Sequence, residues 1–592
     1  MTTLGLAITT AIWAALAHGA AAPAAREVSP ETLAALDPTR LAALTCRGAT
    51  GAVLVERLSL ARDFAASRPA GRGPLPLYPG ISRSDLELKG IEGDARRYFD
   101  QGLVLSFGFN HAAAIRSFRE AQRLAPDCAM CWWGEALAHG PNINAPMDPA
   151  QLGEAIAALD RARRAAAGAG QLERDLIGAL TLRYSADPGA NRAALDAAYA
   201  DAMLKVAARH PQSDAIAVLA AEAAMDTRPW DYWDAGRRQP QGRIGEAIAL
   251  IEGVMARRPD HIQAAHLYIH LMENYADPRR AEAAADRLVA ATPAQVGHLV
   301  HMPAHIFYRV GRYRDSIRAN VLAARADEAF LAGPGDDGLY RFGYYPHNIH
   351  FIVASAQMAG DMRTAVGEAR RLAKVLDADT AARLPWVQAI HAAPAFALTQ
   401  FASARDILAQ PAPDPRLAYV QGMWHYSRAV ARARAHDRRG FDAELEAIAL
   451  LAEAPATRAM VELGVPGPDL LRLASSVARG RFAYSAGRYD EAADHYRAAL
   501  AIERTLPYNE PPYWYYPVSQ SLGAALYRAK DYEGARAAFQ AALVAAPANG
   551  WALYGLGLTE RRLGHRAEAA AAEAALARAW LGDRRWLKLD RL

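Results

Sequence analysis

A pattern of small and aromatic residues recurs near the end of the chain, and it constrains the fold more than any other feature. Residues 520–547 have the sequence QSLGAALYRAKDYEGARAAFQAALVAAP. The recurring positions here are Leu522-Gly523, Ala535, Phe539, Ala542 and Pro547, and a repeat of about 34 residues with this spacing forms two antiparallel helices. Small residues let the two helices approach closely, and the proline ends the second helix. One such pair cannot bury its apolar face, so we expect pairs to stack.

Similar units run through most of the chain. Residues 101–126 carry the same positions as Gly102, Ala114, Phe118, Ala121 and Pro126. Weaker copies place the small residue of the second helix at Ala247, Ala281, Ser316, Ala365 and Ala404. The composition is rich in good helix formers and almost lacks Val-Ile-Thr runs, so we predict an all-α fold, an α-solenoid or superhelix of antiparallel helix pairs. The predicted divisions are a superhelix at residues 91–475, and C-terminal repeats with a capping helix at residues 476–592.

The start of the chain predicts export. The first 25 residues contain no Asp, Glu, Lys or Arg, and an apolar run from Leu4 to Leu16 precedes small residues. This pattern is typical of a signal peptide, placed at residues 1–24, and it predicts a periplasmic or secreted protein with an N-terminal extension at residues 25–90. A misplaced start codon or a membrane anchor remain alternatives. No later segment has the roughly 18 apolar residues that spanning a bilayer requires.

The three cysteines are Cys46, Cys128 and Cys131, and export would permit a disulfide between two of them. The sequence leaves open whether Cys128 pairs with Cys131 or with Cys46. The single CxxC at Cys128 has no second CxxC to complete a zinc site and no βαβ context, so a structural role is favoured over redox chemistry.

Seven of the 17 histidines occur in three short stretches, HLYIH (266–270), HLVHMPAH (298–305) and HNIH (347–350). Spacings of three and four place each set on one face of a helix. Neutral imidazole is the commonest protein ligand for Zn, Cu and Fe, and a nearby carboxylate completes or orients such a site. The predicted metal ligands are His266, His270, Glu273, His301, His305 and His350. The HExxH motif of the common zinc peptidases is absent.

The repeats resemble the tetratricopeptide repeat (TPR) superfamily. The segments CAMCWWG, TRPWDYW, HLVHMPAHIF and YYPHNIHF resemble those of exported bacterial TPR proteins, and more distantly the tetratricopeptide repeat protein 38 group. The resemblance implies a binding role and a concave groove lined by the first helix of each repeat, on which all seven histidines would lie. It places further ligand-binding residues on the same wall: Glu222, Asp226, Asn274, His298 and His347. Aromatic residues of adjoining loops, Trp230, Trp233 and Tyr345, would cover this wall or pack between repeats.

Three functions therefore remain open. The first is a scaffold that binds a peptide or protein partner in a His-rich groove, with or without a metal. The second is a metal-dependent hydrolase or oxidoreductase, and the third is an assembly scaffold in which the histidines only pack. A net charge of +4 over 592 residues gives no support to nucleic-acid binding, and no phosphate-binding loop or nucleophile motif is present.

Overall fold

A computed structural model describes residues 28–29, 32, 74–187, 189–293, 295–333 and 340–592. The described residues form α-helices joined by short 3-10 turns and one π turn, and their only β-structure is two isolated bridges, Asn142 with Ala145 and Trp233 with Pro240. The predicted all-α solenoid is confirmed. The predicted signal peptide and most of the N-terminal extension lie outside the described residues.

The helices follow one another along the chain as antiparallel neighbours. In the first half they are α4 Gly93–Phe107, α5 His111–Leu124, α6 Ala129–Ala138, α7 Leu152–Ala165, α8 Gln171–Thr181, α9 Arg192–Arg209, α10 Asp214–Asp226, α11 Ile244–Arg257, α12 Ile262–Met272, α13 Glu282–Ala291, α14 Gly297–His301, α15 Pro303–Arg309 and α16 Tyr313–Ala332. In the second half they are α17 Tyr345–Ala359, α18 Met362–Val375, α19 Ala378–Arg383, α20 Gln388–His391, α21 Ala393–Phe401, α22 Ala404–Leu408, α23 Ala418–Arg434, α24 Arg438–Ala452, α25 Pro455–Glu462, α26 Gly467–Ser485, α27 Tyr489–Glu503, α28 Val518–Ala529, α29 Tyr532–Ala545, α30 Gly550–Leu563 and α31 Arg566–Ala579.

The repeat residues pack as the spacing predicts. The fully buried ring of Phe118 lies against Gly102 of its own repeat and Gly134 of the next, where an added Cβ would stand 2.6 and 2.4 Å from the ring. Phe539 occupies the same position between Gly523 and Gly555 near the end of the chain. Glycine is needed at these positions because the aromatic ring takes the space that a side chain would fill.

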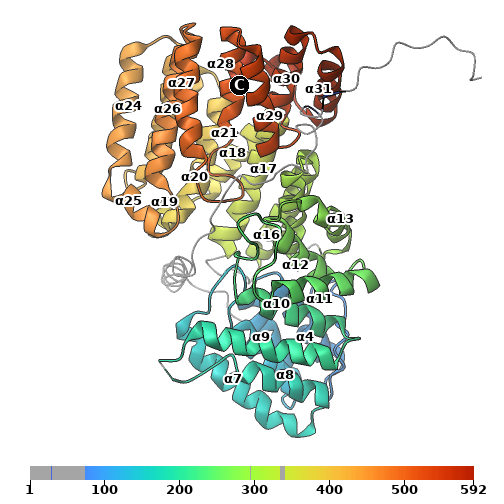
Figure 1. The fold of residues 1–592 in the computed structure, drawn as a ribbon. Coiled ribbons are helices and arrows are strands. Elements are labelled where there is room, and N and C mark those ends of the chain that lie inside the picture. The colour runs from blue at the N-terminus through green and yellow to red at the C-terminus, as the bar shows by residue number, and fades with distance from the viewer. Residues whose placement is uncertain (1–27, 30–31, 33–73, 188, 294, 334–339) are drawn as a thin grey trace, which may run out of the picture.

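The apolar cores divide at a different place from the one predicted. Two clusters draw on residues 75–340 and 109–310, and a third extends from Ala304 to Leu592. The predicted boundary between residues 475 and 476 falls inside α26, so no helix pair ends there. Figure 1 shows a lower group of helices from α4 to α13, which supply most of the first two clusters, and an upper group from α17 to α31, which supply most of the third.

The C-terminal repeats fold back onto the middle of the chain. The backbone N–H of Leu581 donates to the carbonyl of Ala359 at 2.9 Å, at the end of α17. Trp551 of α30 donates its indole N–H to the carbonyl of Gln357 at 2.8 Å. In Figure 1 the red helix α30 accordingly stands beside α17. This return brings residues far apart in sequence close to the histidine-rich helices.

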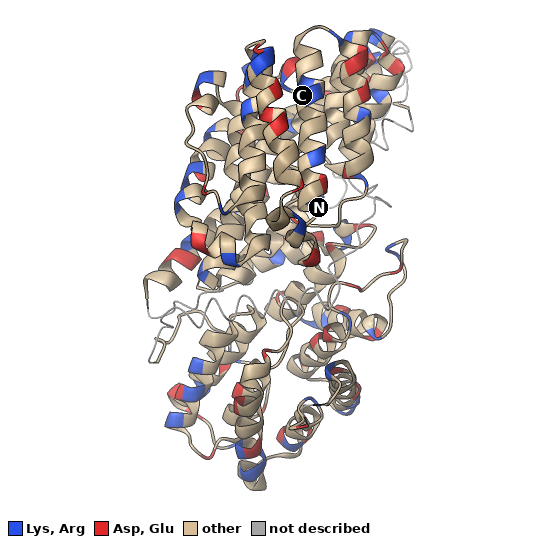
Figure 2. Ribbon diagram, turned by 90° about the vertical axis from the view of Figure 1, so that its left-hand side faces the viewer, with Lys and Arg blue, Asp and Glu red and all other residues tan. Residues whose placement is uncertain are grey.

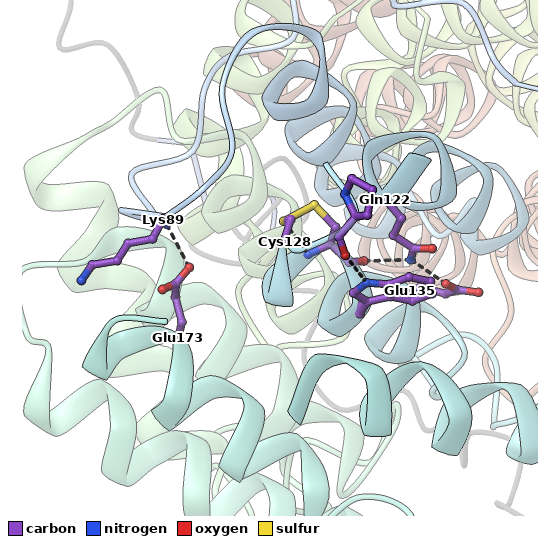
Figure 3. The surroundings of a disulfide bond; sticks show 8 residues. Lys89, Gln122, Cys128, Glu135 and Glu173 are labelled. Atoms are coloured by element: carbon purple, nitrogen blue, oxygen red, sulfur yellow. Dashed lines mark hydrogen bonds between the residues drawn. A yellow bond between two sulfur atoms is a disulfide. The ribbon is translucent and has the colours of Figure 1, made fainter. Parts of the chain in front are cut away.

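The segment before α4 and the disulfide brace the first repeats (Figure 3). The backbone N–H of Lys89 donates to Oε1 of Glu173 on α8 at 3.0 Å. Cys128 forms a disulfide with Cys131, which answers the question of pairing, and its Sγ accepts the N–H of Cys131 at the start of α6. Both cysteines are buried, as expected of a structural disulfide. Cys46 lies outside the described residues.

Charged residues of both signs alternate on the helices, with no large single-sign area in the view of Figure 2. Among the described residues, no helix has the length and apolarity that crossing a bilayer requires.

Candidate metal centre

Four helices bring the histidines together. His266 and His270 lie on α12, and Glu273 directly follows that helix. His298 and His301 lie on α14, which ends at His301 because Pro303 starts a new helix, α15, carrying His305. His347 and His350 lie on the first turns of α17. A spacing of four residues directs His266 and His270 to a common side, and likewise His301 and His305.

The histidines are enclosed, whereas the sequence predicted an open groove. The exposed fraction is 0% at His266, 1% at His301 and 9% at His350, and only His347 is half-buried. Two aromatic rings cover the cluster. Phe109 lies with its ring centroid 4.9–5.7 Å from His266, His270 and His298, and Phe351 lies 4.8–5.1 Å from His301, His305 and His347. The physical reason is that the loop before α5 and the folded-back C-terminal repeats pack over the predicted wall.

The imidazoles form two groups of three. We call His266, His270 and His298 the first triad, and His301, His305 and His347 the second triad. In each triad one ring nitrogen per histidine lies within 4.8 Å of the other two. The closest approaches are between Nε2 atoms, 3.3 Å from His266 to His298 and 2.8 Å from His301 to His305.

Oriented amides decide which ring nitrogen of two histidines carries the proton. The amide nitrogen of Asn320 donates to the carbonyl of Ser316 at 2.9 Å, so its Oδ1 faces Nδ1 of His301 at 2.5 Å. The amide nitrogen of Gln263 likewise faces the Glu222 carboxylate at 3.4 Å, and its Oε1 faces Nδ1 of His266 at 3.0 Å. An amide oxygen only accepts hydrogen bonds, so both imidazoles donate Nδ1–H and keep the lone pair on Nε2.

Glu273 contacts one histidine of each triad and acts in the same way on the first of them, His270. Its Oε1 lies 2.8 Å from Nδ1 of His270, and its Oε2 lies 2.7 Å from Nδ1 of His305. A carboxylate is also only an acceptor, so His270 keeps its lone pair on Nε2, which is buried and has no hydrogen-bond partner within the described part of the chain. This is the arrangement in which a carboxylate orients a metal-binding imidazole.

Glu510 lies in the connection between α27 and α28. It reaches His305, which stands 205 residues earlier in the chain. Its Oε2 lies 2.8 Å from Nδ1 of His305, while its Oε1 accepts from the hydroxyl of Tyr508. With Glu273 and His305 it forms a further group whose ligand atoms are close enough to hold an ion. Glu510 is not among the residues predicted from the sequence. Its signal is the segment NEPPYWYY (509–516), which interrupts the C-terminal repeats with prolines and aromatics.

Burial sets the protonation of most of the cluster. Desolvation, and then the neighbouring imidazoles, hold the pKa of His266, His298, His301 and His347 well below the usual value. Burial also lowers the pKa of His270, against the opposing effect of Glu273. His305 is the exception: burial disfavours its charge, but Glu273 and Glu510 outweigh that effect and raise its pKa to about 10. Apart from His305, the two triads thus offer neutral imidazoles, the form that binds metals.

His350 and His347 differ from their predicted roles. His350, predicted as a metal ligand, belongs to neither triad and lines a small cavity with Tyr308 and Pro511. Burial lowers its pKa to about 4. His347, predicted only as a ligand-binding residue, belongs to the second triad. The two are three residues apart on α17, and the orientation of that helix turns only His347 toward the second triad.

The acidic residues of the predicted wall lie behind the first triad. Glu222 accepts from Gln263, and Oδ2 of Asp226 accepts from Arg183 at 2.5 Å. Burial raises the pKa of both carboxyls. Their role in this geometry is to orient neighbouring groups, since neither belongs to a group of potential metal ligands in the described residues.

The remaining predicted residues divide between the centre and the packing around it. Trp230 stands edge-on to His270 with 5.4 Å between ring centroids. Asn274 follows the end of α12, and its buried Oδ1 has no hydrogen-bond partner within the described residues. Trp233 is a packing residue whose indole N–H donates to the carbonyl of Leu271 at 2.8 Å. Tyr345 donates to Glu328 at 2.7 Å, whereas its neighbour Tyr344 contacts His298 with 5.1 Å between ring centroids.

Comparison with known proteins identifies no family for the chain. No protein-family model matches the chain, and no curated protein matches it. Among solved structures, the human IFIT1 dimer with m7Gppp-AAAA is 12% identical, with 88% of this chain and 95% of that chain covered and a TM-score of 0.28. The TPR domain of P58(IPK) is 12% identical over 84% of this chain and 98% of that one, with a TM-score of 0.20. The Cut9-Hcn1 hetero-tetramer of APC/C is 14% identical over 82% of this chain and 90% of that one, with a TM-score of 0.23.

The chain folds as a TPR-like α-solenoid, as shown by its own helix pairs and by the glycine–aromatic packing between successive repeats. The TPR helices supply the frame in which the two triads meet.

Proposed function

We propose that this protein is an exported TPR scaffold whose buried His/Glu centre binds a transition metal, of the class Zn, Cu or Fe. The observation that carries the proposal is the inward lone pair on Nε2 of His266, His270 and His301. Each of these imidazoles donates its Nδ1–H to an oxygen that can only accept. Late transition metals take imidazole nitrogen as a preferred ligand.

Packing alone is a weaker explanation of this centre. A buried polar atom without a partner costs about 1–3 kcal/mol, and here Nε2 of His270 and Nδ1 of His298 are both buried without one in the described region. Apolar residues would fill the same space at no such cost. A metal ion bound to Nε2 of His270 would remove part of this cost, which is why we favour binding over packing.

The proposal includes export and a protein or peptide partner. The first 24 residues support export through their signal-like composition, and the buried disulfide Cys128–Cys131 is of the kind that persists in oxidising compartments. Stacked repeats offer extended surfaces that suit protein partners. Sequencing the N-terminus of the protein from a periplasmic or culture fraction tests the export: a chain that still begins at Met1 and stays with the cytosol would refute it.

The direct test is metal analysis of the full-length protein after purification without chelators and with a single affinity step. We expect at least one equivalent of Zn, Cu or Fe, and its loss in a His266→Gln/His301→Gln variant. His350→Gln is the matched control, because this buried histidine lies on α17 outside both triads and its replacement leaves the metal in place. A protein that neither carries a metal nor binds Zn, Cu or Fe on titration would overturn the proposal.

A metal-dependent hydrolase or oxidoreductase is the second candidate, and one observation favours it. A cavity of about 460 Å³ is lined by Glu510, Tyr308 and Tyr508, so a small molecule could approach the residue that touches His305. Cavities of this size suit small organic ligands. The metal-loaded protein is therefore screened for ester and amide hydrolysis and for phenol oxidation, with the metal-free protein as control. Turnover only in the loaded protein supports the enzyme, and its absence leaves the binding role.

A further inference from the structure

We infer that the centre holds two metal ions, one in each triad. This inference deepens the proposed function and rests on it. The two triads share no residue, and each gathers three imidazole nitrogens within 4.8 Å. Zinc sites in proteins usually take four ligands, so six imidazoles exceed what one such ion binds, while three imidazoles per ion leave one position for water or another ligand.

The distances fit two neighbouring sites. Between the triads, the ring centroids of His298 and His301 are 6.2 Å apart, and those of His270 and His305 are 6.4 Å apart. Within the triads, the ring centroids are 4.7–6.0 Å apart. The grouping as three and three therefore comes from the ring nitrogens, and the adjoining triads suit a pair of ions a few ångströms apart.

Each triad also has its own set of orienting oxygens. Gln263 holds His266 in the first triad, and Asn320 holds His301 in the second. Glu273 is common to both, with one oxygen on His270 and the other on His305. A carboxylate that holds one ligand of each site through Nδ1 fixes the two sites relative to each other, and such outer partners set ligand orientation in metal proteins.

The charge around the second triad favours a cation there as well. Glu273 and Glu510 both place a carboxylate oxygen within 2.8 Å of His305. Two buried carboxylates offset much of the charge that two divalent ions would bring into a site shielded by Phe109 and Phe351. Removal of these ions from water is unfavourable without such compensation.

The test counts ions in the full-length protein and in variants of each triad. After loading with Zn²⁺ and removal of the excess, we expect about two equivalents in the wild type by elemental analysis. A His266→Gln/His298→Gln variant and a His301→Gln/His347→Gln variant should each retain about one, and the His350→Gln control should retain two. Far-UV circular dichroism verifies that each variant is folded.

The outcomes separate this inference from the function on which it rests. One equivalent in the wild type that both double variants lose would mean a single site, refuting the pair while preserving metal binding. No metal in the wild type would refute both. If a double variant fails to fold, the wild type alone decides: competition against a chromophoric chelator shows two equivalents for a pair and one for a single site. X-ray absorption of the loaded protein should then show a metal–metal distance of about 3.5–4 Å.

Discussion

Replacing Glu273 by Gln should weaken the centre more than any other single change outside the imidazoles. The fully buried carboxylate accepts from His270 and forms an ion pair with His305, and an amide NH₂ in place of one oxygen would face a ring N–H. Loss of such an orienting partner lowers metal affinity about 10- to 100-fold, and here both triads lose one. Breaking a buried charge pair also lowers the free energy of unfolding of the metal-free protein by about 3–5 kcal/mol.

Competition with a chelator measures the affinity, and urea unfolding followed by circular dichroism measures the stability. Glu252→Gln is the matched control, since Glu252 pairs with Arg280 on the partly exposed surface of the same region. It should leave metal affinity unchanged and cost no more than about 1 kcal/mol. If Glu273→Gln binds metal as tightly as the wild type, the carboxylate does not orient the two histidines and our account of the centre is wrong.

Three further changes test other parts of the structure. Glu510→Gln should lower metal affinity about 10- to 100-fold at the second triad only; equal loss at both triads, or none, would contradict the assignment. Burial raises the pKa of the Asp327 carboxyl to about 7, so the folded state holds a proton that the unfolded state releases near pH 4. The free energy of unfolding should therefore fall by up to about 4 kcal/mol as pH rises from about 4 to 7. Urea unfolding at several pH values should show that Asp327→Asn lacks this part of the pH dependence. Gly134→Ala places a Cβ 2.4 Å from Phe118 and should destabilise by about 1–3 kcal/mol, whereas Gly178→Ala on α8, with nothing within 4 Å, should stabilise by up to about 1 kcal/mol.

The fold was predictable because its determinants are local. Spacing of small and aromatic residues within 34 positions specifies a helix pair, and the contacts of Phe118 and Phe539 with their glycines follow directly from that spacing. The gathering of His266 with His270 and of His301 with His305 was predictable for the same reason, since each pair lies one helical turn apart.

The rest of the centre depends on features that spacing does not encode. The π turn at Tyr340–Tyr344 leads directly into α17, and residue spacing does not predict such a turn. The orientation of α17 places His347, and not His350, in the second triad, and Tyr344 contacts His298. Glu510 was beyond prediction because its contact with His305 requires the C-terminal repeats to fold back onto α17.

The same return of the C-terminal repeats has a consequence for how the protein is made. In an open solenoid each repeat depends only on its neighbours, so early repeats can mature while later ones are still being synthesised. Here Glu510 supplies part of the centre from among the C-terminal repeats, which themselves return to α17. Most of the chain must leave the ribosome before Glu510 can contact His305 of the second triad. Loading of metal would then follow synthesis and any export, and it would occur with the ions of the destination compartment.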